Sequence, residues 1–154
     1  MGEKMAESKY VVFKVAEEFY GIQIERVERI LPEQDITKLP KMSKLLLGIF
    51  NLRGETLAAV DLRARFELPA GEGLGNYIVV QTDHGRCALH VDGVVGISMI
   101  SEENVDEHEI LQQKSGDGFI TGIAKTPDRL VALLEPDELL TPALRTEVAK
   151  VSAA

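Results

Sequence analysis

The stretch LLLGIFNLRGETLAAVDL, residues 45–62, contains two apolar runs separated by a short polar corner. The first run ends at Phe50, the corner is Asn51-Leu52-Arg53-Gly54, and the second run continues to Leu62. Apolar runs bounded by such a corner are typical of two strands joined by a β-turn, and glycine readily adopts the backbone angles that a tight turn requires. The stretch therefore predicts a β-hairpin with Arg53 at its tip.

Short strands joined by turns are predicted along most of the chain. The sequence favours one hairpin near the N-terminus, a second in the middle with a further strand after it, and a third near the C-terminus. The runs are YVVFKV and FYGIQI (10–15 and 19–24), NYIVVQ, RCALHV and VVGISMI (76–81, 86–91 and 94–100), and GFITGIAK and RLVALLE (118–125 and 129–135). Closely spaced short strands with turn signals between them predict an all-β barrel or sandwich.

Two internal segments break this pattern. In ERVERIL, residues 25–31, apolar residues recur at spacings of three and four, which predicts a helical turn that Pro32 ends. The loop-like segment PAGEGLG divides the strands into two clusters near residues 69–76. Two clusters around a glycine-rich division predict two small barrels that share a core.

The two ends of the chain lie outside these strands. Residues 1–8 are small and charged and predict a disordered lead-in to a single domain over residues 9–142. Thr141 and Pro142 are typical of the N-cap and the first residue of a helix, so a helix and tail are expected over residues 143–154.

Composition narrows the classes of function. The 154 residues include 17 Lys and Arg against 25 Asp and Glu, which gives a net charge of −8. Nucleic-acid binding and docking on an anionic membrane need clustered positive charge, so neither is expected. The start of the chain lacks the apolar segment of a secretion signal, and the longest apolar runs are far shorter than a membrane span. A soluble cytoplasmic domain is the expectation.

His84, Cys87 and His90 are the closest set of potential metal ligands or catalytic groups. In a strand, Cys87 faces away from the two histidines, which would lie roughly 20 Å apart. A metal site would need a sharp turn at Gly85, and a cysteine nucleophile would need an activating base. We expect a buried free thiol instead.

Three further features resemble functional motifs without matching them. The glycines of the 69–75 loop, Gly71, Gly73 and Gly75, lack the spacing of a phosphate-binding loop. Asp61 and Asp92 have no paired carboxylate for acid–base chemistry. An acidic run lacks the ligand spacing of a calcium loop and is interpreted as a solvated face; it comprises Glu102, Glu103, Asp106, Glu107 and Glu109. The sequence thus predicts no enzyme, cofactor or metal site.

Several groups of residues, taken together, resemble the CheW family of bacterial chemotaxis coupling proteins. The resemblance covers about residues 8–142, and its most specific part is GIFNLRG followed by an Asp-Leu pair. The groups are Phe13, Tyr20-Gly21-Ile22, Ile24, Val27 and Ile30; Gly48 to Gly54; Val60-Asp61-Leu62-Arg63; Val91-Asp92-Gly93-Val94; and Phe119 to Ile123.

This resemblance implies a mainly β fold: two small five-stranded antiparallel β-barrels of the SH3-like type that share a hydrophobic core, with a short C-terminal helix. It also implies a non-enzymatic cytoplasmic adaptor that is recruited to membrane receptor arrays. Such an adaptor joins the cytoplasmic tips of methyl-accepting chemoreceptors to the regulatory domain of the histidine kinase CheA, a domain of the same fold. Receptor conformation then biases kinase activity through bound contacts alone.

By matching positions, the resemblance implies a receptor-facing groove on this chain. A receptor tip is a helical hairpin, and apolar anchors in a groove recognise one face of a helix. The implied residues are Val27, Arg29, Ile30, Gly48, Asn51, Leu52, Arg53, Gly54 and Val95. Kinase contacts are expected at the barrel ends, without assignment to residues.

Arg29 departs from the family pattern, in which a glutamate usually occupies this position and pairs with the arginine that matches Arg53. Two arginines would face each other here unless Glu25, Glu28 or Glu55 takes over the pairing. Glu25 and Arg29 have the i, i+4 spacing of a helical ion pair, if the turn is helical. The departure predicts either a surface altered for a different receptor tip or a paralogue that serves another kinase array.

Two alternative functions stay open. One is a CheW-like scaffold in a receptor–kinase array with a different output, such as pilus motility or gene regulation. The other is a small-ligand-binding β-barrel, which would need a pocket with convergent polar groups.

Overall fold

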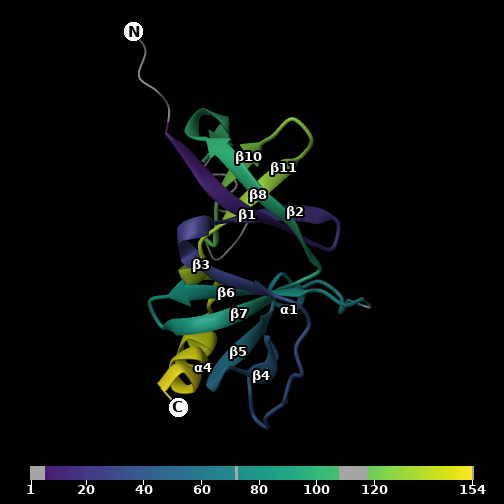
Figure 1. Cartoon of the computed structure of the whole chain (residues 1–154), viewed down its shortest axis with the longest axis vertical. Coiled ribbons are helices and arrows are strands. Elements are labelled where there is room, and N and C mark those ends of the chain that lie inside the picture. The colour runs from purple at the N-terminus through teal and green to yellow at the C-terminus, as the bar shows by residue number, and fades with distance from the viewer. Residues whose placement is uncertain (1–5, 72, 108–117, 154) are drawn as a thin grey trace.

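Two β-sheets lie one above the other along the long axis of the molecule (Figure 1). The computed structural model describes residues 6–71, 73–107 and 118–153, so that residues 1–5 of the predicted lead-in lie outside the described residues. The six-stranded sheet has the order β8 (Gly93–Ser101), β1 (Glu7–Val15), β2 (Glu18–Gln23), β11 (Leu130–Leu134), β10 (Ile120–Lys125) and β9 (Val105–Asp106). The five-stranded sheet has the order β3 (Val27–Leu31), β6 (Asn76–Thr82), β7 (Gly85–Val91), β5 (Glu55–Asp61) and β4 (Leu46–Leu52).

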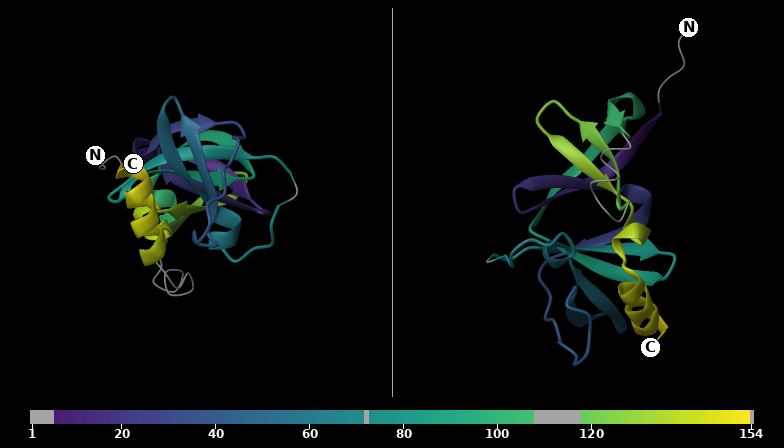
Figure 2. Two further views of the ribbon diagram at one scale, coloured as in Figure 1. Left: turned by 90° about the horizontal axis from the view of Figure 1, so that it is seen from below. Right: turned by 180° about the vertical axis from the view of Figure 1, so that it is seen from behind.

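Short helices connect and cover the sheets. They are the 3₁₀ turns η1 (Ile24–Arg26) and η2 (Glu102–Asn104) and the α-helices α1 (Leu62–Arg65), α3 (Pro136–Leu139) and α4 (Pro142–Ala153). Helix α4 packs beside the five-stranded sheet, against β5 and β7 (Figure 2). No described helix has the length and apolar character needed to cross a membrane.

The predicted fold class is confirmed, with two refinements. One sheet has six strands because the two-residue β9 pairs with the edge of β10. Each sheet also contains one parallel pair, β2 with β11 and β5 with β7, among otherwise antiparallel neighbours. All the predicted hairpins form, including β4–β5 around the corner at Asn51 to Gly54.

The chain passes between the two sheets at places that the sequence analysis did not indicate. Strands β1 and β2 belong with the C-terminal strands β10 and β11, and the chain crosses from one sheet to the other at η1 and again at Asp92. The division predicted near residues 69–76 does not separate the sheets, since β5 and β6 on either side of it both lie in the five-stranded sheet.

The helical turn predicted over residues 25–31 is wrong for most of its length. Only η1 is helical, and Val27–Leu31 forms β3, which pairs with β6. The register shifts between Val27 and Arg29, so Glu28 is the extra residue of a β-bulge. A bulge changes the alternation of side chains along a strand, which explains why the apolar spacing resembled that of a helix.

The two sheets share one hydrophobic core. Buried Val11 and Phe13 of β1 lie in the same cluster as Val80 of β6 and Leu89 of β7. The N-cap of α4 is Thr141, as predicted: its Oγ1 accepts a hydrogen bond from the Leu144 N–H at 3.3 Å. Leu144 and Val148 of this helix are fully buried in the shared core, so the helix fastens the C-terminus to it.

Each sheet also has a smaller apolar cluster on the face away from the shared core. On the five-stranded sheet it contains Phe50, Leu57, Ala59, Tyr77, Val79 and Ala88. On the six-stranded sheet it contains Val12, Ile100, Ala124, Val131 and Leu133. Side chains fill these positions, which is typical of small barrels rather than of barrels that enclose a ligand.

Candidate functional site

The residues assigned to a receptor groove fall into three groups. Val27, Arg29 and Ile30 lie on β3, Gly48 and the 51–54 corner lie on the β4–β5 hairpin, and Val95 lies on β8. Strands β3 and β4 are opposite edges of the five-stranded sheet, and β8 is an edge of the other sheet. The predicted site therefore depends on how these edges are connected.

Asn76 connects β3 to β8. Its Nδ2 donates to the Leu31 carbonyl at 3.3 Å, and its Oδ1 accepts from the Val94 N–H at 3.3 Å. The next residues along these strands, Ile30 and Val95, are exposed by 41% and 51%. The junction between the two sheets thus carries two of the predicted apolar contacts.

Strand β8 adds two apolar residues that the sequence analysis missed. Ile97 and Met99 are exposed by 60% and 58%, and they follow Val95 at every second position along an edge strand. Ile97 and Met99 are two apart in the strand and lie on one face. Val95 is the extra residue of a β-bulge against Val12 and Phe13, and because it is also exposed it extends this row. The signal in the sequence was the alternation of large apolar residues with Gly96 and Ser98. We call these three residues the β8 row.

The β4–β5 hairpin presents Arg53 at its tip. Arg53 and Gly54 both have positive φ, 51° and 89°, as in the two-residue turns that match the twist of hairpin strands. The Gly54 N–H donates to Asn51 Oδ1 at 3.0 Å, which closes the corner. Arg53 is exposed and occupies a conformation that favours glycine or asparagine, so the turn holds an arginine outward at a conformational cost.

Gly48 is not part of the surface but lies where two segments of the chain pack closely. It is buried, its φ is 146°, and a Cβ there would lie 2.3 Å from the Thr37 carbonyl oxygen. Thr37 pairs with Ile49 as an isolated bridge, so the segment after β3 lies directly on the hairpin at this point.

A third arginine takes the carboxylates that were expected to pair with Arg29 or Arg53. Arg86 of β7 donates through Nε to Glu28 at 2.7 Å and through Nη1 to Glu55. These hydrogen bonds, chiefly the one that Arg86 donates to Glu55, raise the pKa of Arg86 above its ordinary value. Within the described residues, neither Arg29 nor Arg53 makes an ion pair.

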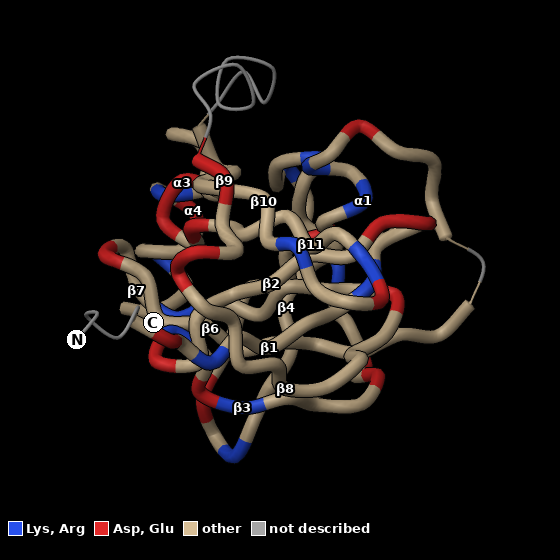
Figure 3. Tube along the Cα trace, turned by 90° about the horizontal axis from the view of Figure 1, so that it is seen from above, with Lys and Arg blue, Asp and Glu red and all other residues tan. Residues whose placement is uncertain are grey.

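Arg29 is half-buried, and its Nε is buried without a hydrogen-bond partner among the described residues. Its register partner on β6 is Val79, which belongs to the apolar cluster of the five-stranded sheet. The helical Glu25–Arg29 pair does not form because residue 29 is in a strand. Figure 3 shows acidic and basic segments meeting along β3.

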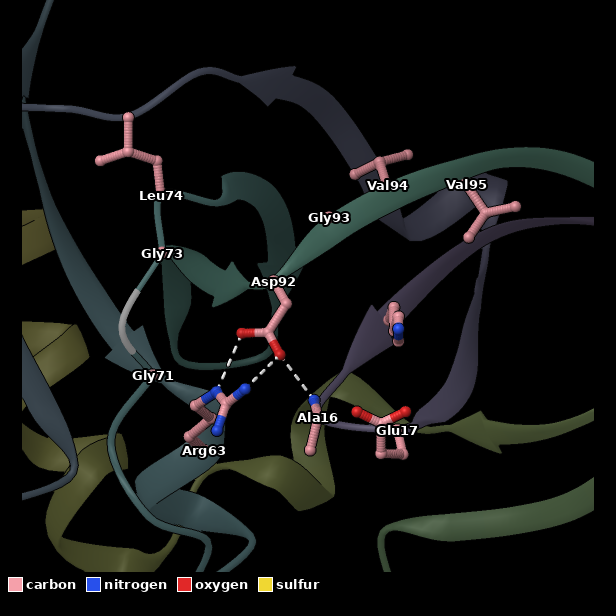
Figure 4. Close-up of a pocket in the computed structure, with 11 residues that line it drawn as sticks. Ala16, Glu17, Arg63, Gly71, Gly73, Leu74, Asp92, Gly93, Val94 and Val95 are labelled. Carbon is pink, nitrogen blue, oxygen red and sulfur yellow. Dashed lines mark hydrogen bonds and ion pairs between the residues drawn. The ribbon is translucent and has the colours of Figure 1, made fainter.

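An ion pair lies at the second crossing between the sheets (Figure 4). The guanidinium of Arg63 donates to both carboxylate oxygens of Asp92, at 2.9 and 2.7 Å, and Asp92 also accepts from the Ala16 N–H at 2.6 Å. Beside this pair is a hollow of about 460 Å³ that Val95 also lines, with Leu74 opposite and 83% exposed. Asp92 thus has a structural partner, and the hollow opens next to the β8 row.

The groups considered for chemistry lie apart. Burial raises the pKa of the Cys87 thiol to about 12, so the thiol is protonated at neutral pH. His90 Nε2 lies 2.6 Å from Glu33 Oε1, while His84 is in the turn between β6 and β7. No group of three or more His, Cys, Asp or Glu among the described residues could hold a metal ion.

The other candidate motifs, which are the acidic run, the glycine loop and Asp61, are either exposed to solvent or make hydrogen bonds within the fold. In the acidic run, Glu102, Glu103, Asp106 and Glu107 are exposed, and Glu109 lies outside the described residues. The Gly75 N–H donates to Glu33, and Asp61 accepts from the Arg63 N–H as the N-cap of α1.

Comparison with known proteins gives one consistent answer. The CheW-like domain family matches residues 9–143. The chemotaxis protein CheW of Treponema pallidum is 26% identical over 137 residues, which is 85% of this chain and 81% of that protein. The chemotaxis protein CheW of Thermotoga maritima is 26% identical over 141 residues, 91% of this chain and 92% of that protein. The crystal structure of the scaffolding protein TtCheW from Thermoanaerobacter tengcongensis is similar with a TM-score of 0.81 and 30% identity, over 90% of this chain and 96% of that one.

Proposed function

The chain belongs to the family of CheW-like domains, and from this premise we propose that it is a non-enzymatic chemotaxis scaffold that couples chemoreceptor tips to the regulatory domain of a CheA-type histidine kinase. The observation that carries the proposal is the family match, which extends over residues 9–143 of the 154. The protein acts in the cytoplasm and is recruited to receptor arrays by these two partners.

The surface at the junction of the sheets supports receptor binding. Ile30 and the β8 row are large apolar side chains that solvent reaches, and Asn76 holds their strands together. Contiguous exposed apolar residues mark interaction sites, and an amphipathic helix offers anchors at i, i+3 and i+4 that fit such a surface. The receptor hairpin lies along this junction.

The architecture also supports binding of a like-folded kinase domain. Both sheets end in edge strands, β8 and β9 in one and β3 and β4 in the other. Edge strands and barrel ends allow domains of the same fold to associate through similar elements. The kinase contact is expected at the barrel ends, away from the β8 row.

The absence of catalysis is supported by the state of the one nucleophilic side chain considered. Cys87 is fully buried in the shared core, and its raised pKa removes the thiolate that a nucleophile requires. Coupling is then a matter of binding free energy: each partner biases the conformations of the other through contacts with the scaffold.

Calorimetric titration against both partners tests this function. The probes are the purified regulatory domain of each CheA-type kinase encoded in the same genome and the cytoplasmic hairpin of a chemoreceptor from that genome. Saturable one-to-one binding to one kinase domain and to the hairpin is expected. Absence of binding to every kinase domain would overturn the coupling role. Binding to a kinase of a pilus or gene-regulation array would keep the scaffold role and change its output.

A further inference from the structure

We propose that Arg29 binds a carboxylate supplied by the partner, so that this scaffold selects a helical hairpin with an Asp or Glu facing β3. The inference rests on the proposed function and adds the chemistry by which one class of receptor tip is recognised. It starts from the charge pattern around β3.

The three glutamates that the sequence offered as partners of an arginine here do not pair with Arg29. Glu28 is its direct neighbour, and Glu55 follows the hairpin tip; Arg86 binds both with a single guanidinium. The Glu25–Arg29 spacing would serve only a helix, whereas β3 is a strand. Arg29 therefore has no ion-pair partner within the described part of the chain.

The environment of Arg29 makes this lack of a partner significant. Its Nε is buried and makes no hydrogen bond among the described residues. A buried charged donor without a partner is unfavourable, because it has lost water without gaining an acceptor. The side chain is only half-buried and β3 is an edge strand, so an acceptor can approach from outside the sheet.

A carboxylate is the ligand that fits best. Arginine and carboxylate form short paired hydrogen bonds in one plane, through Nε and a terminal nitrogen. A polyanion such as a nucleic acid would also meet Glu25 and Glu28, which are close to Arg29 in the chain and exposed, in a chain of net charge −8. One isolated carboxylate on a protein helix avoids this repulsion.

The position of Arg29 is compatible with a helix on the proposed receptor surface. Ile30, the next residue, is exposed, and Asn76 ties the end of β3 to β8. Adjacent residues of a strand face opposite sides of the sheet, and Arg29 and Ile30 pair with Val79 and Ile78 of different apolar clusters. A helix with its side chains is about 10–12 Å wide, so a helix lying along the exposed edge of β3 would have Ile30 on one side of the edge and Arg29 on the other. Arg53, exposed at the hairpin tip, adds positive charge on the other side of the Arg86 bridge.

A charge-swap experiment tests the inference. The affinity of the cytoplasmic hairpin of a chemoreceptor from the same genome is measured by calorimetry for the wild-type chain and for Arg29→Gln, Arg29→Glu and Lys150→Gln. The last variant removes one positive charge from an exposed residue of α4. Each Asp and Glu at the hairpin tip is then changed to Lys in turn and titrated against Arg29→Glu.

The expected result is a loss of affinity of about tenfold or more for Arg29→Gln, a larger loss for Arg29→Glu, and less than about twofold for Lys150→Gln. One Lys-substituted hairpin should restore binding to Arg29→Glu, and salt should weaken the wild-type complex more than the Arg29→Gln complex. Thermal denaturation of each variant identifies any loss of affinity that is due to misfolding.

The two levels of proposal fail in different ways. If the wild-type chain binds the hairpin and Arg29→Gln binds as tightly as Lys150→Gln, the carboxylate inference is wrong and the scaffold function stands. An Arg29→Glu defect that no Lys-substituted hairpin restores also contradicts the inference. If the wild-type chain binds no hairpin, the receptor-binding function fails and the inference fails with it.

Discussion

Arg63 and Asp92 form a two-point ion pair that joins the two sheets, with Nε–Oδ1 and Nη2–Oδ2 distances of 2.9 and 2.7 Å. Arg63 follows β5, and Asp92 lies where the chain leaves β7 for β8. Because Asp92 also accepts the Ala16 N–H from the β1–β2 turn, one carboxylate fastens that turn of the six-stranded sheet to the five-stranded sheet. The pair therefore controls how the two halves of the proposed receptor surface are held.

Asp92→Asn should destabilise the protein by roughly 1–3 kcal/mol, because the amide has one acceptor oxygen in place of two and so loses one of the hydrogen bonds from Arg63, together with the negative charge. Urea denaturation at neutral pH measures the change in free energy of unfolding. Asp128→Asn, at an exposed residue of the β10–β11 turn, is the matched control and should have almost no effect. Equal stabilities of the two variants would show that the pair does not fasten the sheets.

Acid should weaken the fold through Asp92 and Asp137. Hydrogen bonds from Arg63, and from the Ala16 N–H, hold the pKa of Asp92 below its ordinary value against the opposing effect of burial. Burial also raises the pKa of Asp137, but hydrogen bonds from the Asp83 N–H and from Arg26 outweigh this effect, so that the pKa of Asp137 lies below its ordinary value. A carboxyl with a lowered pKa in the folded state stabilises at pH values above its unfolded pKa, and this contribution is lost as the pH falls through the folded pKa.

The melting temperature should therefore fall as the pH is lowered from about 5 to about 2. The fall should be smaller for Asp92→Asn, which has lost one of the two groups. Thermal denaturation followed by circular dichroism over this range measures it. Parallel pH profiles for the wild type and Asp92→Asn would rule out a contribution from Asp92.

Much of the fold was predictable because its hairpins are local. The turn at Asn51 to Gly54 and the strands on either side of it are specified by neighbouring residues, and the structure confirms them. The assignment of strands to sheets was not predictable in this way. Strands β1 and β2 join β10 and β11 through pairing between residues more than 100 positions apart, such as Phe19 with Val131. A linear division of the chain cannot show such pairing.

The candidate site was predictable only in part for similar reasons. The bulge at Glu28 altered the spacing of β3, so a strand resembled a helical turn. The state of Arg29 depends on Arg86, which lies on another strand and takes both Glu28 and Glu55. Exposure of Ile97 and Met99 follows from the edge position of β8, which the sequence alone does not give.

Gly48→Ala should destabilise the protein by roughly 1–3 kcal/mol, because the added methyl group would overlap the backbone of Thr37 and the φ of 146° is unfavourable for alanine. Gly73→Ala is the matched control, since a Cβ at Gly73 meets no atom within 4 Å. Urea denaturation of both variants makes the comparison. If the two have the same stability, the close approach of residue 37 to the hairpin is not maintained in solution.

Cys87 should react with a thiol reagent such as Ellman's reagent only when the protein opens. It is the single cysteine, it is fully buried, and its pKa of about 12 leaves little thiolate at pH 8. The native protein should show slow release of the coloured product, and protein in urea should show rapid release. Rapid reaction under native conditions would mean that β7 is accessible, contrary to its place in the shared core.

Ile97→Lys should weaken binding of the receptor hairpin by at least about tenfold while changing stability by less than about 0.5 kcal/mol. Ile97 is the centre of the β8 row and is 60% exposed, so a lysine there removes an apolar contact without leaving a cavity. Leu130→Lys is a close control, because Leu130 is also 60% exposed and lies on β11 of the same sheet, separated from β8 by β1 and β2. Calorimetric titration of the hairpin against both variants should show a loss for Ile97→Lys alone. Equal affinities would place the receptor contact away from β8, and a loss only for Leu130→Lys would move it to β11.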